Sequence, residues 1–512
     1  MLRKYALAPP LPVIWAISRH LQDDAPSPYP KPLQDEVQSW QLNLLVRELI
    51  VNADLTRGRS FRRLGDLYAA LRVIMAAWDV SYAHGASPEQ LLRDLTAMGH
   101  QQFPWQTQSS MQALFRYYRI LRRPDMAAMV ERVVGMDVRT YFLIGIIGGG
   151  ELIRRPWVDV CRPLDEVNVA PELVQRFYAR LTTRIAPLRH AIWAKQSFDR
   201  SWGYTWNPLE ATPLLQLDRG SRQAYAPIPE FYYRAITHGL YYALVKQAAF
   251  SRAIGEAFEA YVGEVLHAAF AGPPWQVRGE TPYLVGKARK HGADWVVTDG
   301  TGHLVIECKA KRLRLDAKMP GADDSFDQQL EVLAQAVVQL YKNIRDAQSG
   351  DNQAWQPNGL PVYPVVVTLD EWHLFGPIAL QTLEERVVAG LGQAGIPTTM
   401  RQAMPYTVCS AEDFERGVLT VAELGLATVF GEKTQDDYKA RSLHAFVMHR
   451  HPEVAARVHR DLFWDDLREI APFEAVHGPP RQTGAPQGQV EPIRLEEPKD
   501  LVAIGQHTIS RT

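Results

Sequence analysis

Three ionisable residues that lie close together in the sequence have types and a spacing suited to chemistry. They are Asp294, Glu307 and Lys309, and the last two belong to the segment HLVIECKA, whose composition is typical of a β-strand. Because side chains alternate between the two faces of a strand, Glu307 and Lys309 project to one side, and Ile306 and Cys308 to the other. Burying a carboxylate and an ammonium group in such a strand is costly even when they pair. We therefore expect the pair to have a function, the alternative being an exposed ion pair at a sheet edge.

Asp294 begins the preceding segment, ADWVVT, and the turn at 299–302 joins the two segments into a hairpin. Antiparallel pairing can then bring Asp294 near Glu307 and Lys309. Two carboxylates that converge form an oxygen site of the kind that Mg²⁺ prefers, completed by water and substrate phosphate. Mn²⁺ could substitute, and the backbone carbonyl of Cys308 could add a ligand. Such a metal would polarise a phosphoryl oxygen and activate water, while Lys309 would orient that water and neutralise charge.

The spacing resembles a known family. Asp294, twelve residues and then Glu307-Cys308-Lys309 are similar to the motif of the PD-(D/E)xK nuclease superfamily, in which an acidic residue, any residue and Lys follow an Asp across a hairpin. The resemblance implies a restriction-endonuclease-like αβββαβ core. It also implies that Asp294 and Glu307 bind the metal and that Lys309 assists the attacking water. In the preceding helix, the segment GEAFEAY resembles the family motif that supplies a further acidic residue, Glu259, with Glu264 as the second choice.

Two features depart from that family pattern. Ala293 stands where a literal Pro would precede Asp294, and the Gln-x-x-x-Tyr of some members is not present at its usual spacing. Gln335 and Gln339 are one helical turn apart and could face the site. By resemblance we include Gln335 among the candidate catalytic residues, and Glu259 among both the catalytic residues and the metal ligands.

The elements that must position these residues can be read from hydrophobic periodicity. Residues 253–270 predict a helix with one apolar stripe, and residues 275–285, 293–298 and 303–310 predict strands. A long helix at 324–348, a buried strand at 362–369, a helix at 378–391 and a short strand at 406–409 follow. The order of helix, three strands, helix and strand indicates an α/β sandwich within residues 246–475.

Residues 1–245 show helical periodicity wherever it can be read, so we predict an all-helical region and, overall, an α+β protein. Ser87-Pro88 marks a helix start. Residues 171–196 predict one long helix interrupted at Pro187, the glycines at 148–150 predict a helix break, and residues 200–232 predict irregular structure or a short hairpin. Residues 476–512, rich in Gly, Pro and Gln, predict a disordered tail.

Composition limits the remaining classes. The net charge of −1 gives no overall attraction to a polyanion, so nucleic acid must be held by a local patch. Three cysteines cannot build a disulfide framework, which favours the cytoplasm. The most apolar run, 141–147, is too short to span a bilayer, so we expect no membrane partner. Basic residues near the hairpin could contact phosphates, or could form an ordinary charged loop: Lys287, Arg289, Lys290, Lys311, Arg312, Arg314 and Lys318.

The resemblance implies a Mg²⁺-dependent nuclease that hydrolyses phosphodiester bonds, with DNA as the expected polymer and RNA as an alternative. Family resemblance alone favours bacterial defence against phage or foreign DNA. DNA repair or recombination is the second interpretation, and a nuclease fold that binds nucleic acid or a protein without cutting is the third. The helical region could sense a phage-derived trigger, bind a protein partner or assemble a homo-oligomer.

Overall fold

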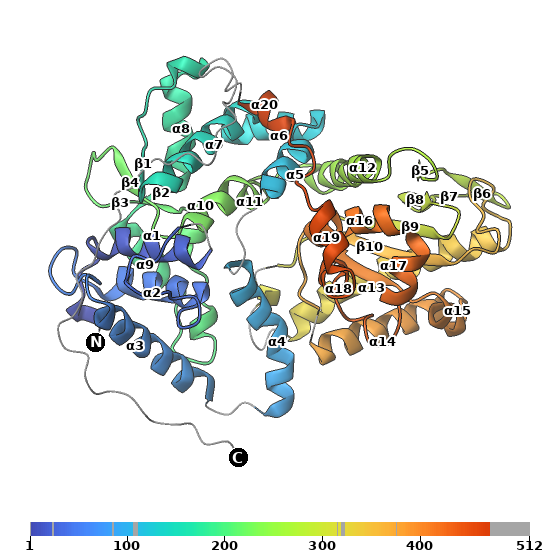
Figure 1. The fold of residues 1–512 in the computed structure, drawn as a ribbon, viewed down its shortest axis with the longest axis horizontal. Helices are drawn as coiled ribbons and strands as arrows, with labels where there is room; N and C mark the ends of the chain where they lie inside the picture. The colour runs from blue at the N-terminus through green and yellow to red at the C-terminus, as the bar shows by residue number, and fades with distance from the viewer. Residues whose placement is uncertain are drawn as a thin grey trace.

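The computed structural model describes residues 2–22, 25–83, 87–105, 111–314, 316–318, 323–374 and 376–471. The tail expected at 476–512 lies outside these residues. In Figure 1 the N-terminal helices lie on the left, and the C-terminal sheet with its helices lies on the right. The mixed α+β class expected from the sequence is confirmed.

Residues before 245 are mostly helical. Their helices are α1 (Pro10–Leu21), α2 (Ser39–Asn52), α3 (Leu64–Ala83), α4 (Pro88–Gln102), α5 (Met111–Leu121), α6 (Pro124–Val134), α7 (Val138–Arg154), α8 (Pro171–Leu181), α9 (Ile185–Trp193), α10 (Pro229–Ile236) and α11 (His238–Leu244). The helix start at Ser87-Pro88 is confirmed, because the Ser87 side chain accepts a hydrogen bond from the Gln90 amide at 3.1 Å.

The expectation of an all-helical region is wrong. A small sheet with the order β1-β4-β3-β2 lies among these helices. Its strands are β1 (Trp157–Asp159), β2 (Thr182–Arg184), β3 (Leu214–Gln216) and β4 (Gln223–Tyr225). Strands of three residues are too short to show an alternating pattern, so periodicity cannot reveal them. The hairpin alternative for 200–232 agrees with β3 and β4, which pair antiparallel.

The predicted long helix at 171–196 is divided at Thr182–Arg184, not at Pro187. The β-branched Thr182 and Thr183 pair with β3, which is a contact between segments far apart in the sequence. Pro187 lies in the first turn of α9, where a proline removes no helical hydrogen bond. The interruption therefore comes from long-range strand pairing rather than from the proline.

The predicted helix break at 148–150 is also wrong, because α7 runs through all three glycines. A Cβ atom on Gly148 would lie 2.3 Å from the hydroxyl of Tyr232 and 2.7 Å from that of Tyr178. The missing side chain lets α8 and α10 approach α7 closely, and the Tyr232 hydroxyl donates to the Gly145 carbonyl at 3.0 Å. Glycine here serves helix packing rather than helix termination.

The C-terminal region begins with α12 (Phe250–Ala269). Its strands are β5 (Gln276–Gly279), β6 (Tyr283–Val285), β7 (Ala288–Lys290), β8 (Trp295–Thr298), β9 (His303–Lys309), β10 (Val362–Thr368) and β11 (Thr407–Ser410). The further helices are α13 (Asp323–Gln348), α14 (Pro377–Gln393), α15 (Thr398–Ala403), α16 (Ala411–Leu424), α17 (Leu426–Lys433), α18 (Leu443–Arg450), α19 (Pro452–Val458) and α20 (Asp466–Ile470). The strand expected at 275–285 is two strands, which belong to different sheets and are separated by residues 280–282.

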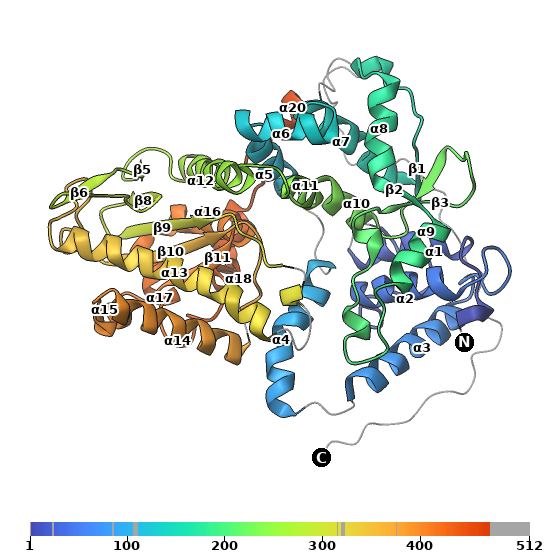
Figure 2. The same cartoon turned by 180° about the vertical axis from the view of Figure 1, so that it is seen from behind.

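The main sheet has the order β11-β10-β9-β8-β5. Strands β9, β10 and β11 are parallel, whereas β8 and β5 add antiparallel strands at the other edge. Figure 2 shows α13 and α14 along this sheet, and their apolar residues share a core with Val305 and Val366. The stripe of α12 packs with the opposite face, which carries Leu304 and Ile306.

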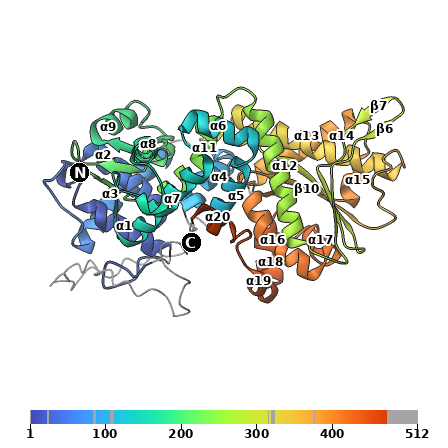
Figure 3. The same ribbon diagram turned by 90° about the horizontal axis from the view of Figure 1, so that it is seen from above.

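The hydrophobic core on the α12 side continues across residue 245. It joins Phe258 and Val262 of α12 to residues of α5, α7 and α8, such as Phe115, Phe142 and Phe177. Figure 3 shows α12 between these helices and the sheet. Among the described residues no single helix is long and apolar enough to cross a membrane, whereas the pair α6 and α7, bent by 64°, meets these criteria when taken together.

Candidate active site

The register of the β8–β9 hairpin brings two of the expected residues together. Trp295 pairs with Ile306 in antiparallel register, so Asp294, one residue earlier, lies beside Glu307. The backbone N–H of Cys308 donates to Asp294 Oδ2 at 2.6 Å, which fixes this carboxylate at the end of β9. Residues opposite each other in a sheet point to the same face, so Asp294 and Glu307 share the face of Val305 and Val296.

Lys309 lies on the same face as Glu307, two residues further along β9. Its Nζ donates to Glu307 Oε1 at 2.7 Å. The Glu307 side chain is 8% exposed and the Lys309 side chain 31%, so the pair lies at the border between core and solvent. This position fits a site that must admit a substrate, and Lys309 engages one of the two oxygens of Glu307.

Glu259 comes from α12, which is anchored to β8 by one side chain. Trp295 Nε1 donates to the Glu259 carbonyl at 3.0 Å, and the indole ring lies against Gly263, where a Cβ would approach it to 2.1 Å. Glycine at this position allows the close approach of helix and strand. Burial raises the pKa of Glu259 to about 7, and the nearby carboxylates of Asp294 and Glu280 add to the effect.

A fourth acidic residue, Glu280, was missed by the sequence analysis. Strand β5 pairs with β8 so that Gly279 faces Trp295, and Glu280, the next residue, therefore lies beside Asp294. His291 contacts its carboxylate, with 2.6 Å between Nδ1 and Oε1. Glu280 can be recognised as a site residue only from the pairing register of β5 with β8, which the sequence alone does not show.

The electrostatics of the site show an excess of negative charge. Burial raises the pKa of Glu307 to about 7, with Asp294 contributing in the same direction and Lys309 opposing it. Burial also raises the pKa of Asp294, although the hydrogen bond from the Cys308 N–H and the charge of Lys309 each act to lower it. Burial alone would lower the pKa of Lys309, but Glu307 and Asp294 outweigh it and raise that pKa. One lysine thus faces several carboxylates, which is an arrangement that a cation would stabilise.

The carboxylate oxygens of Asp294 and Glu307 have the hard donor chemistry that Mg²⁺ requires. In the described part of the chain, no group of three or more His, Cys, Asp and Glu side chains could hold a metal ion by itself. The donor chemistry of Asp294 and Glu307 fits Mg²⁺ or Mn²⁺ as an ion held by two carboxylates, with backbone, water or substrate oxygens as the further ligands. The Cys308 side chain lies against the α12 core, and burial raises its thiol pKa well above the usual value.

The remaining expected residues have other contacts. Gln335 is exposed on α13, where its side-chain amide donates to Glu331 at 3.2 Å. Glu264, the second choice on α12, is paired with Arg119 of α5 and with Arg123, the residue before α6. Among the basic residues, Arg312 pairs with Asp370 and Lys290 with Asp346, whereas Lys287 and Arg289 are exposed on the β6–β7 ribbon.

Comparison with known proteins gave no match. No family model, no curated protein and no solved structure matches this chain. Function must therefore be inferred from the site itself.

Proposed function

We propose that the chain is a Mg²⁺-dependent nuclease, and that its C-terminal region has the restriction-endonuclease-like core of the PD-(D/E)xK superfamily. The order α12, β5, β8, β9, α13 and β10 follows the αβββαβ pattern of that core. One observation carries the proposal, namely that Asp294 and Glu307 lie side by side on neighbouring strands with Lys309 on the same face.

Each side chain has a role that follows from its surroundings. When bound, the metal ion would polarise the phosphoryl oxygen and supply an activated water. Asp294 and Glu307 would hold it, and the hydrogen bond from Cys308 keeps the Asp294 carboxylate oriented. Lys309 keeps its proton on Nζ because the neighbouring carboxylates raise its pKa, so it acts as a cation and donor that orients water and stabilises developing charge. Glu259 would support the site from α12.

The proposed substrate is nucleic acid, with DNA as the expected polymer. Lys287 and Arg289 are exposed on the β6–β7 ribbon, and Lys311 is exposed just after β9, so these cations could contact a phosphate backbone. In Figure 1 the β6–β7 ribbon lies at the right-hand end of the molecule. We further propose a cytoplasmic protein that acts in bacterial defence against phage or foreign DNA, with repair or recombination as the alternative.

The test is cleavage of supercoiled plasmid, linear DNA, single-stranded DNA and RNA with Mg²⁺ or Mn²⁺. Wild-type protein should cleave, and Glu307→Gln and Lys309→Met should each lower the rate by about 10³-fold. Glu453→Gln and Lys246→Met alter exposed residues outside the site and serve as matched controls. Cleavage that survives both site substitutions would reject the proposal.

A second candidate is a nuclease fold that binds nucleic acid without cutting it. It is favoured by the finding that no three acidic or metal-ligating side chains of the described residues form a complete metal site. The same proteins distinguish the two functions. A gel-shift of DNA without cleavage at any concentration of Mg²⁺ or Mn²⁺ would support binding alone.

A further inference from the structure

A cavity of about 750 Å³ lies between the N-terminal helices and the carboxyl ends of the parallel strands. Arg312 follows β9, Asp370 and Glu371 follow β10, and Ser410 ends β11 on one side of it. Residues of α2, α4 and α11 and the turn at 208–210 form the other side. Asp294, Glu307, Lys309, Glu259 and Glu280 are not among its lining residues. The cavity is therefore separate from the candidate active site, and its volume is typical of small-molecule sites.

The lining carries more positive than negative charge, with eight Lys and Arg side chains against five Asp and Glu. Several of the arginines are neutralised, as Arg312 is by Asp370 and Arg116 by Glu415. Among the described residues, Arg180, Lys195 and Lys318 have no carboxylate within ion-pair distance. Arg180 donates to the Val133 carbonyl at 3.4 Å and Lys195 Nζ lies over the Trp206 ring, so Lys318 is the cation of the three that is most open to an anionic ligand.

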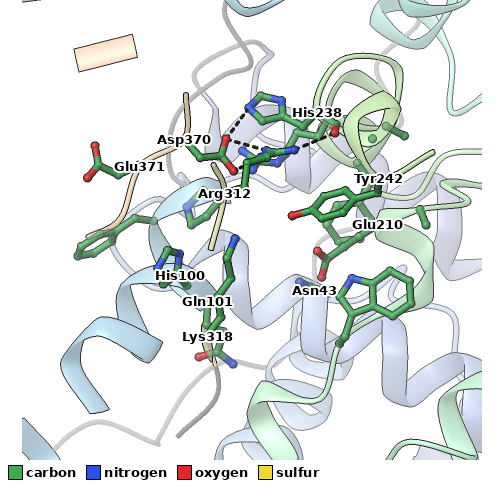
Figure 4. Close-up of a pocket in the computed structure, with 18 of the residues that line it drawn as sticks. Asn43, His100, Gln101, Glu210, His238, Tyr242, Arg312, Lys318, Asp370 and Glu371 are labelled. Carbon is green, nitrogen blue, oxygen red and sulfur yellow. Dashed lines mark hydrogen bonds and ion pairs between the residues drawn. The ribbon is translucent and has the colours of Figure 1, made fainter. Parts of the chain in front are cut away.

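Lys318 lines the cavity together with His100 of α4, Glu210 and Asp370. Burial lowers the pKa of His100 well below its usual value, and the Lys318 charge acts in the same direction. Burial raises the pKa of Glu210 to about 7, and the Lys318 charge opposes that shift. Figure 4 shows Lys318 reaching into the space that His100, Glu210 and Tyr242 surround.

Aromatic and polar side chains complete the lining. Tyr242 is 52% exposed although it lies inside this cleft, and the Arg312 guanidinium lies 5.0 Å from its ring centroid. Trp206 lies 4.9 Å from Lys195 Nζ. His100 Nε2 and Gln101 Oε1 are buried there and have no hydrogen-bond partner, which is a costly state for buried polar atoms. Each of these rings has a cation over it, but the half-exposed Tyr242 still presents ring surface to the cavity. Exposed ring surface and unsatisfied polar atoms are the complement of a ligand that is aromatic and bears hydrogen-bonding edges.

We propose that this cavity binds a nucleoside phosphate, with the base stacked on Tyr242 or Trp206 and the phosphate held by Lys318. A base has the π-face that stacks on aromatic side chains, and its polar edge can satisfy His100 and Gln101. A phosphate supplies the negative charge that the unpaired cations lack. The inference is independent of the proposed nuclease activity, because it uses none of the residues of the hairpin.

The test is isothermal titration calorimetry of the full chain with ATP, AMP, adenosine and inorganic phosphate. EDTA is present so that a metal-bound nucleotide cannot occupy the carboxylate site. We expect AMP or ATP to bind at one site per chain. Adenosine and inorganic phosphate should bind at least about tenfold more weakly, because each makes only part of the contacts.

Two variants locate the binding. Lys318→Ala and Tyr242→Ala should each weaken nucleotide binding by about tenfold, whereas Lys246→Ala, which alters an exposed lysine outside the cavity, should leave it unchanged. Thermal unfolding of each free variant checks that it is folded. Absence of nucleotide binding up to about 1 mM, equal affinity for inorganic phosphate and AMP, or unchanged affinity in both cavity variants would overturn the proposal.

Discussion

The hairpin site and the cavity lie at the same end of the sheet, but they have opposite charge. At the hairpin, Asp294 and Glu307 face Lys309, Glu259 and Glu280 add negative charge beside Asp294, and burial raises the pKa values of Asp294, Glu307 and Glu259. In the cavity, cations outnumber carboxylates, and Lys318 has no ion-pair partner in the described part of the chain. The first arrangement is suited to a divalent cation and the second to an anion.

The difference shows how one end of a sheet can form two sites of opposite charge, because the segments that follow its strands lead to different places. Lys309 ends β9 and remains at the hairpin, whereas Arg312, three residues later, already lines the cavity and pairs with Asp370. The two regions can therefore be perturbed separately, and the following variants test how independent they are.

The largest effect is expected where the two regions are joined. Arg116 lines the cavity and makes two 2.7 Å hydrogen bonds to Glu415, which also accepts from Tyr261 of α12 at 2.8 Å. Both charged side chains are almost fully buried. Arg116→Met leaves an unpaired buried carboxylate and should lower the free energy of unfolding by about 3–5 kcal/mol, measured by urea denaturation.

The double variant Arg116→Met with Glu415→Leu is the control for that prediction. Removing both charges avoids the buried unpaired carboxylate, so the double variant should lower the free energy of unfolding by less than Arg116→Met alone. Equal loss in both proteins would show that packing, not charge, joins the regions.

A smaller effect is expected on the helical side alone. Gly148→Ala places a methyl group against the hydroxyls of Tyr232 and Tyr178, and overpacking should lower the free energy of unfolding by about 1–3 kcal/mol. Gly150→Ala is the matched control on the same helix, since nothing lies within 4 Å of its added Cβ. It should raise stability by about 0.5–1 kcal/mol. Destabilisation by both changes would contradict the close packing at Gly148.

A change confined to the hairpin is Glu280→Gln. It removes a negative charge beside Asp294 and Glu259 without removing a proposed ligand. The Mg²⁺ concentration that gives half-maximal cleavage should rise by about tenfold, and nucleotide binding to the cavity should not change. An altered nucleotide affinity would show that the two regions are coupled.

A change confined to the cavity is Glu210→Gln. Burial raises the pKa of Glu210 to about 7, while Arg234 and Lys318 oppose the shift. The folded state therefore holds a proton that the unfolded chain releases near pH 4.5, so this group lowers the free energy of unfolding as the pH rises from 4.5 to 7. In Glu210→Gln that decline should be smaller, by on the order of 1 kcal/mol, measured by urea denaturation at pH 5 and pH 7.5. An identical decline in both proteins would contradict the raised pKa.

Local patterns predicted the parts of the fold whose contacts are local. The hairpin at 293–310, the apolar stripe of α12 and the helix α13 follow from alternation and helical periodicity, and the structure contains all three. The juxtaposition of Asp294 and Glu307 also follows, because only a short turn separates their strands.

Features that depend on distant segments could not be read in this way. The small sheet pairs three-residue strands from four separate segments, and Glu280 joins the carboxylates only through the register of β5. The glycines of α7 have the composition of a helix break, but they permit contact with tyrosines of other helices. The cavity combines residues from α2 to α18, so no stretch of sequence marks it.

The central claim is that Asp294 and Glu307 together hold a divalent cation. Electron paramagnetic resonance of added Mn²⁺ measures this directly, because bound Mn²⁺ loses the signal of the free ion. Wild-type protein and the Glu453→Gln control should bind Mn²⁺, and Asp294→Asn and Glu307→Gln should each lose that binding while remaining folded. Binding that persists undiminished in both carboxylate variants would contradict the account.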